Sequence, residues 1–130
     1  MWRAEGMGEF YTYLPPYTDS KFAANKKVCN VAPKSECNPT YGASVGRGAF
    51  HFKVGVWNHI SERVRLNDAG QANGELELFF NGKSVINVSG LILRDSDKGR
   101  IHGIQMQTFF GGAYSIDLLL TGFSQCIFFR

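Results

Sequence analysis

The chain has 130 residues, of which 44% are apolar and 19% are charged. This length suits one domain, residues 1–130, with a single hydrophobic core, and the composition is that of a folded protein and not of a disordered one. The net charge of +3 comes from scattered basic residues, so an anionic ligand is a better expected partner than nucleic acid. No apolar run reaches the roughly 18 residues of a spanning helix, so no membrane partner is expected.

The first predicted element is a strand over residues 9–14, where the sequence alternates and then stops at Pro15-Pro16. Residues 17–45 show no clear periodicity and are expected to form a long loop. A loop of this length inside a compact domain is usually functional or covers another part of the fold. No helix longer than a turn or two is expected anywhere in the chain.

Strand signals dominate the rest of the sequence, and polar turn clusters separate them. Asn81-Gly82 is the strongest hairpin signal. Further strands are predicted at residues 49–54, 57–66, 75–80, 83–88 and 100–110. About seven short strands with regular turn signals predict an all-β fold, an antiparallel sandwich or jelly roll.

The three cysteines bear on the compartment in which the protein works. Cys29 and Cys37 bracket a polar loop that a disulfide would close, while Cys126 lies in an apolar tail. Three unpaired thiols are the alternative, but the paired loop is favoured and implies an oxidising environment. The sequon Asn87-Val88-Ser89 also fits secretion. The first residues lack the apolar run of a signal peptide, so either the protein stays inside the cell or its true beginning lies upstream.

The residues taken alone give little chemistry. The sequence contains no phosphate loop, no nucleophile elbow and no metal-ligand spacing, so no metal or cofactor is expected. Tyr11 and Tyr13 are two residues apart, which places both rings on one face of an extended strand. Packing explains such a pair by itself, because aromatic residues are favoured in strands. The conclusion from the residues is an all-β domain with an aromatic-rich face of the kind that suits carbohydrate.

Four sequence blocks carry a family resemblance: MWRAEGMGEFYTYLPP, GRGAFHFKVGVWNHISERVRLN, GELELFFNGKSVINVSGLILRD and IHGIQMQTFFGG. They follow one another as in polysaccharide lyase family 14, which the chain resembles over residues 1–112. The family contains alginate lyases and enzymes that act on related polyuronates. The resemblance implies a β-jelly roll and a β-elimination reaction, in which a base removes the C5 proton and an acid protonates the departing glycosidic oxygen.

The resemblance also implies the roles of particular residues. Tyr11 and Tyr13 match a catalytic tyrosine pair of the family, although which one is base and which is acid stays open. Arg3 and Arg47 occupy basic positions in the matching blocks and would help to hold the uronate. Gln105 and Gln107 share one parity of the strand predicted at residues 100–110 and would hydrogen-bond sugar hydroxyls. For these four, surface charge at strand ends and polar positions on a half-exposed sheet remain the alternatives.

The chain departs from the family pattern at both ends. The family's Ser-x-Arg pair and a lysine would fall before residue 1, and residues 113–130 form a divergent, apolar tail. We therefore expect an incomplete jelly roll that acts weakly or not at all as a polyuronate lyase on its own, and that is monomeric and secreted in its full-length form. A non-catalytic carbohydrate-binding jelly roll is the alternative. The polymer, whether of mannuronate, guluronate or glucuronate, is not determined by any motif.

Overall fold

The computed structural model describes residues 1–105, and Met1–Arg100 form one compact unit. Along this unit the elements are η1 (Ala4–Gly6), β1 (Met7–Thr12), η2 (Ser20–Asn30), β2 (Glu36–Asn38), β3 (Gly42–His51), β4 (Ile60–Arg65), β5 (Gly74–Phe80) and β6 (Lys83–Leu91). The two η elements are 3₁₀ helices. In the part of the chain that is described, no helix is long and apolar enough to cross a membrane.

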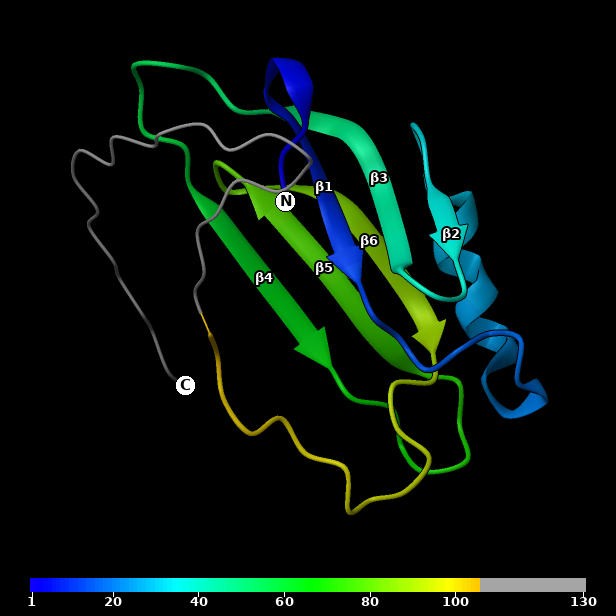
Figure 1. Cartoon of the computed structure of the whole chain (residues 1–130). Coiled ribbons are helices and arrows are strands. Elements are labelled where there is room, and N and C mark those ends of the chain that lie inside the picture. Colours follow the sequence, from blue (N-terminus) through cyan, green and yellow to red (C-terminus); the bar gives the residue numbers. More distant parts are fainter. Residues whose placement is uncertain (106–130) are drawn as a thin grey trace. The chain divides into compact units, whose positions relative to one another are not determined.

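The strands form two antiparallel sheets of three strands each, with the orders β1-β3-β2 and β4-β5-β6. Figure 1 shows the first sheet in front of the second, so the two make a sandwich. The predicted all-β antiparallel fold is therefore confirmed.

The hydrophobic core lies between the two sheets. Leu76 and Leu78 point inward from β5, while Glu75 and Glu77 alternate with them on the outer face. The inward residues pack with apolar side chains of the first sheet, and the Phe50 ring of β3 stacks on Phe80 of β5 with centroids 4.9 Å apart. Burial of these two inner faces is the main stabilising term of the fold.

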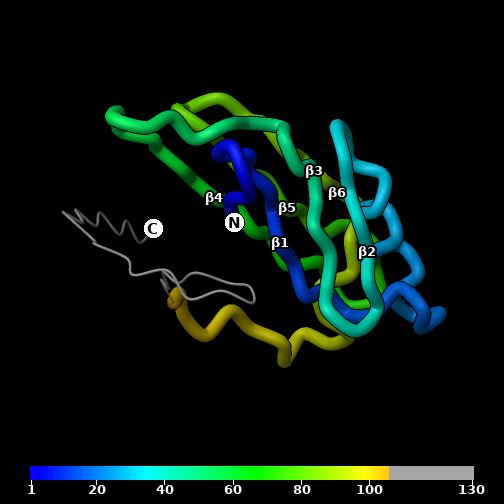
Figure 2. Tube along the Cα trace, turned by 45° about the horizontal axis from the view of Figure 1, so that its top comes forward, coloured from blue at the N-terminus to red at the C-terminus, as the bar shows by residue number. Residues whose placement is uncertain are grey.

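The predicted loop over residues 17–45 is wrong in part, because it contains η2, β2 and the start of β3. The helix η2 has 11 residues and runs along the side of the sandwich beside β2 and β6 (Figure 2). Only Asn25 and Val28 of this helix are buried, so its sequence has no apolar stripe to reveal it. Asn25 fixes it in place by donating to the Pro15 and Ile92 carbonyl oxygens and accepting from the Ile92 amide.

The predicted strand over residues 100–110 is not present in its first half, since residues 101–105 are in no strand. Its second half lies outside the described residues, as do Gln107, Cys126 and the tail. The other predicted strands are present with shifted ends, the largest shift being that of β3, which begins at Gly42 and not at residue 49.

Candidate active site

The outer face of β1 carries the two tyrosines. Tyr11 lies in β1 and Tyr13 follows its last residue, and their rings meet edge to face with centroids 5.4 Å apart. Tyr13 is 78% exposed, whereas Thr12 between them is buried on the opposite face. The structure thus brings the two phenols together on the surface, as the spacing of the sequence predicts.

The Tyr11 phenol is held as a proton donor. Its hydroxyl donates a hydrogen bond to the Tyr41 carbonyl oxygen, in the turn between β2 and β3. The Asn38 side chain shapes this turn by accepting from the Thr40 and Tyr41 amides at 2.8 and 3.1 Å. Desolvation and the neighbouring Tyr13 raise the pKa of Tyr11 above its ordinary value, so the phenol keeps its proton at neutral pH.

A bulge in β3 brings Arg47 to the same face. Between the pairs Gly8–Phe50 and Phe10–Val45, β1 advances by two residues and β3 by five. Gly46 takes a positive φ of 63° inside this bulge. Val45 therefore points into the core, while Arg47, two residues later, reaches the outer face of β1.

Glu9 lies at the centre of the site, with a fully buried side chain between two arginines. Arg3 Nε donates to its Oε1 at 2.8 Å, and Arg3 Nη2 forms an ion pair with the same oxygen at 2.8 Å. Its Oε2 accepts from the Ser44 hydroxyl at 2.5 Å and from Arg47 Nε at 2.9 Å. Burial alone would raise the pKa of Glu9, but the hydrogen bonds from Arg3, Ser44 and Arg47 outweigh it and hold this pKa below its ordinary value.

Tyr11, Arg3 and Arg47 border one open cavity of about 410 Å³, whereas Tyr13 lines a neighbouring pocket. Its walls come from β1, β2, β3, the turn before β3 and the segment before η1. The lining residues are Arg3, Tyr11, Glu36, Cys37, Asn38, Tyr41, Gly42, Ser44 and Arg47. The Arg3 guanidinium lies over the Tyr11 ring, 5.8 Å from its centroid, in a cation–π contact. A cavity with two arginines and a phenol at its wall can hold a carboxylate and offer a proton beside it.

The remaining predicted site residues are two glutamines and two cysteines. Gln105 is exposed and belongs to a second unit, Ile101–Arg130, and Gln107 lies outside the described residues. Cys29 and Cys37 are joined in a disulfide, and Cys37 forms part of the cavity wall. Within residues 1–105, no group of three or more His, Cys, Asp or Glu side chains is placed to hold a metal ion.

Sequence reasoning missed four participants: Glu9, Glu36, Tyr41 and Ser44. Glu9 was open to prediction, because it shares the parity of Tyr11 and Tyr13 and lies three residues before the end of β1. Ser44 and Glu36 had no such signal, since their place depends on how β3 pairs with β1 and β2.

The described part of the chain is an all-β sandwich that carries a tyrosine pair and an arginine-lined cavity on one outer face. These features define its structural class. The comparison with family models then identifies the family. The model of polysaccharide lyase 14 matches residues 1–116, and the chain belongs to this family. A comparison with proteins of curated function found no match.

Among solved structures, the chain is similar to the marine PL-14 alginate lyase from Aplysia kurodai. The two are 30% identical in sequence, with a TM-score of 0.54 over 73% of this chain. The match covers 35% of the Aplysia enzyme's chain, so this chain spans about a third of the length of that protein.

Proposed function

We propose that this chain carries part of the active site of a secreted polysaccharide lyase that cleaves a polyuronate by β-elimination. The observation that carries the proposal is that Tyr11 contacts Tyr13 and shares one cavity with Arg3 and Arg47, in a member of polysaccharide lyase family 14. The solved relative is an alginate lyase, which supports an anionic polysaccharide as the substrate.

The reaction makes three demands on the site. Charge that spreads onto the substrate carboxylate must be stabilised, and Arg3 and Arg47 are the groups of the cavity that suit this task. A base then takes the C5 proton, an acid protonates the glycosidic oxygen, and the C4–O bond breaks as a C4=C5 double bond forms. Acid and base must each lie within hydrogen-bond reach of their atoms.

Tyr11 suits the role of acid better than that of base, because its raised pKa makes the phenolate harder to form and its hydroxyl already donates to an oxygen. Tyr13 is then the candidate base of the pair. An unperturbed phenol with a pKa of about 10 costs about 4 kcal/mol to ionise at pH 7, so a tyrosine base requires nearby positive charge.

One observation favours a second candidate, a carbohydrate-binding domain without turnover. The two arginines of the cavity pair with Glu9, and Glu36 pairs with Arg47 and Lys34, so this network of three cations and two carboxylates leaves little net positive charge for ionising a tyrosine. This balance also supports weak turnover by the chain on its own. The disulfide supports secretion, and a monomeric state remains a prediction.

The experiment incubates the chain with polymannuronate and with polyglucuronate and follows the absorbance of unsaturated uronate products. Weak product formation that Tyr11→Phe and Tyr13→Phe abolish, with binding retained, supports proton transfer by the pair. Tyr17→Phe is the comparison variant, because Tyr17 lines a neighbouring pocket with Tyr13 but lies in no strand and makes no ring contact with Tyr11. Binding without any product favours the second candidate, and unchanged turnover in both variants excludes these tyrosines as acid and base.

A further inference from the structure

The buried carboxylate of Glu9 is the feature that the proposed reaction leaves unexplained. Its side chain has no exposed surface, and both oxygens accept hydrogen bonds, from Arg3 on one side and from Ser44 and Arg47 on the other. Burying a charge is costly, and an apolar side chain of similar size would often be at least as stable. A buried ion network beside a ligand cavity therefore calls for a reason other than stability.

The contacts leave one edge of each guanidinium available. Arg3 uses Nε and Nη2 toward Glu9, and Arg47 uses Nε and Nη2 toward Glu9, Ser44 and Glu36. Among the residues that the structure describes, neither Nη1 atom of the two arginines has a hydrogen-bond partner. Both arginines line the cavity that Tyr11 also lines.

We propose that Glu9 is a positioning residue that fixes Arg3 and Arg47 beside Tyr11, so that their remaining N–H groups receive the carboxylate of an acidic sugar. The proposal rests on the proposed function for the chemical class of the ligand. A free arginine has many rotamers, and ordering it at the moment of binding lowers affinity. The hydrogen bonds to Glu9 order both arginines before the ligand binds, so binding does not carry the free-energy cost of ordering them.

The substitution Glu9→Gln distinguishes two possible roles of Glu9. An effect of its charge and an effect of its positioning of the arginines would change ligand binding in opposite directions. If Glu9 acts only through its charge, removing a negative group beside two arginines strengthens the binding of an anion. If Glu9 positions the arginines, binding weakens, because the glutamine amide presents N–H groups to one of two guanidiniums that have only donors. The expected result is roughly tenfold weaker binding.

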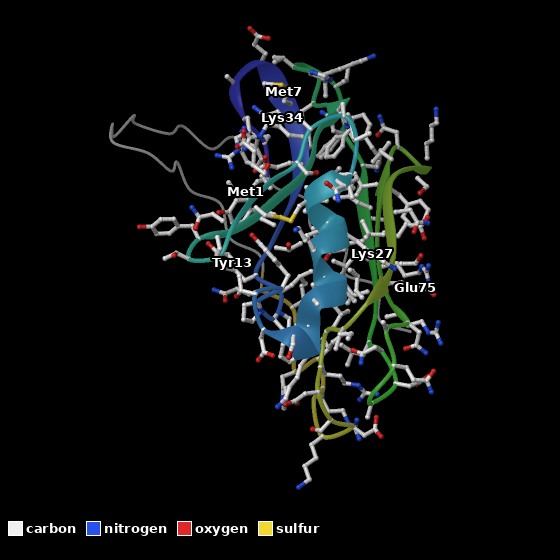
Figure 3. All side chains as sticks on the ribbon, turned by 90° about the vertical axis from the view of Figure 1, so that its right-hand side faces the viewer. Met1, Met7, Tyr13, Lys27, Lys34 and Glu75 are labelled. Carbon is white, nitrogen blue, oxygen red and sulfur yellow. A yellow bond between two sulfur atoms is a disulfide. The ribbon has the colours of Figure 1, made fainter. Side chains whose placement is uncertain are left out.

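The test measures binding of a mannuronate trisaccharide by calorimetry to the wild-type chain, to Glu9→Gln and to Glu75→Gln. Glu75 is the matched control: it also bridges two arginines, Arg63 and Arg65, but it lies on the opposite side of the sandwich from Tyr13 (Figure 3). We expect Glu75→Gln to bind like the wild type. Equal or tighter binding by Glu9→Gln overturns the proposal, as does a wild-type chain that does not bind the trisaccharide.

A second variant covers the case in which Glu9→Gln does not fold. Arg3→Lys keeps the charge but loses the Nε–H and the planar fork that Glu9 holds, so it is also expected to bind roughly tenfold more weakly. Unchanged binding by Arg3→Lys overturns the proposal. Product formation is measured separately: binding with no unsaturated product in the wild type contradicts the lyase function and leaves the role of Glu9 standing.

Discussion

At the scale of single residues, Glu9 is a charged side chain that is buried on the outer face of a sheet. The residue lies on the outer face of β1 with Tyr11, where a strand residue is normally solvated. The bulge of β3 and the two arginines cover it completely, so that its exposed fraction is 0%. The carboxylate stays ionised there because three donors compensate for its lost hydration.

Because of this lowered pKa, the free energy of unfolding depends on pH in the acidic range. A carboxylate whose pKa is lower in the folded than in the unfolded state stabilises the fold above the unfolded value, here 4.5, and this contribution is lost as the pH falls through the folded value. We therefore expect the free energy of unfolding of the wild type to drop as the pH is lowered below about 4.5. Denaturant titrations from pH 7 to pH 3 measure it.

Glu9→Gln isolates the part of this dependence that belongs to Glu9. The variant is expected to be less stable at pH 7 and to lose less stability on acidification, because its amide does not titrate. The surface carboxylates Glu75 and Glu77 also have lowered pKa values, from hydrogen bonds with Arg63 and Ser84, and remain in both proteins. Identical slopes for the two proteins would show that Glu9 is not ionised in the folded state.

At the scale of elements, the bulge of β3 decides which side chains reach the site. Gly46 has a φ of 63°, and a Cβ atom there would lie 2.8 Å from Ile86 Cδ1 in the core. Both the backbone conformation and the lack of space thus require glycine at this position. Without the bulge, strict alternation would turn Arg47 and Val45 to the same side of the sheet.

Gly46→Ala tests this requirement. We expect it to lower the free energy of unfolding by about 2 to 4 kcal/mol, because left-handed strain adds to overpacking against Ile86. Gly70→Ala is the control, since Gly70 has a similar φ of 76° with no atom within 4 Å of its Cβ position, and strain alone costs about 1 kcal/mol. Equal losses in thermal or denaturant unfolding would exclude the contact with Ile86 as a cause.

The disulfide links η2 to the β2 segment that walls the cavity. Cys29 and Cys37 close a short loop with a sequence separation of 8, and Glu36 and Asn38 flank the second cysteine. Constraint of the unfolded chain by a loop of this size stabilises a fold by about 2.5 kcal/mol in the chain-entropy model.

Replacing both cysteines by serine is therefore expected to lower the free energy of unfolding by about 2.5 kcal/mol. It is also expected to weaken trisaccharide binding, because the turn that holds the Tyr11 hydroxyl follows β2 directly. Denaturant unfolding and calorimetry measure the two effects. The wild type in reducing agent is the matched comparison, and full stability after verified reduction would contradict a structural role for the bond.

At the scale of the whole molecule, the chain is basic, and its candidate site lies on one side of the sandwich that residues 1–100 form. The net charge of +3 and the two arginines of the cavity favour an anionic polymer. Because the cavity is open, its charges interact with the ligand through water and are screened by salt.

Affinity for polymannuronate is therefore expected to fall as salt is raised from about 0.05 M to about 0.5 M, over which the screening length drops from about 14 Å to about 4 Å. Binding isotherms at several salt concentrations measure this dependence. A neutral glucan of similar length is the control and is expected to show no such trend. Salt-independent binding of polymannuronate would contradict a charge-based site.

The sequence by itself determined the features that depend on local spacing. The alternation of Leu76 and Leu78 with glutamates indicated β5, and Asn81-Gly82 indicated the hairpin between β5 and β6. The two-residue spacing of Tyr11 and Tyr13 placed their rings together. Each of these follows from the period of a strand or the geometry of a turn, which neighbouring residues alone specify.

Only the tertiary structure decided how the site is assembled. Glu9 meets Ser44 and Arg47 across separations of 35 and 38 residues, through a bulge whose size no local pattern reveals. The helix η2 likewise has no apolar stripe and is held by the bonds of Asn25 to Pro15 and Ile92. These contacts depend on which strands pair and in which register, and the packing of two complete sheets sets that choice.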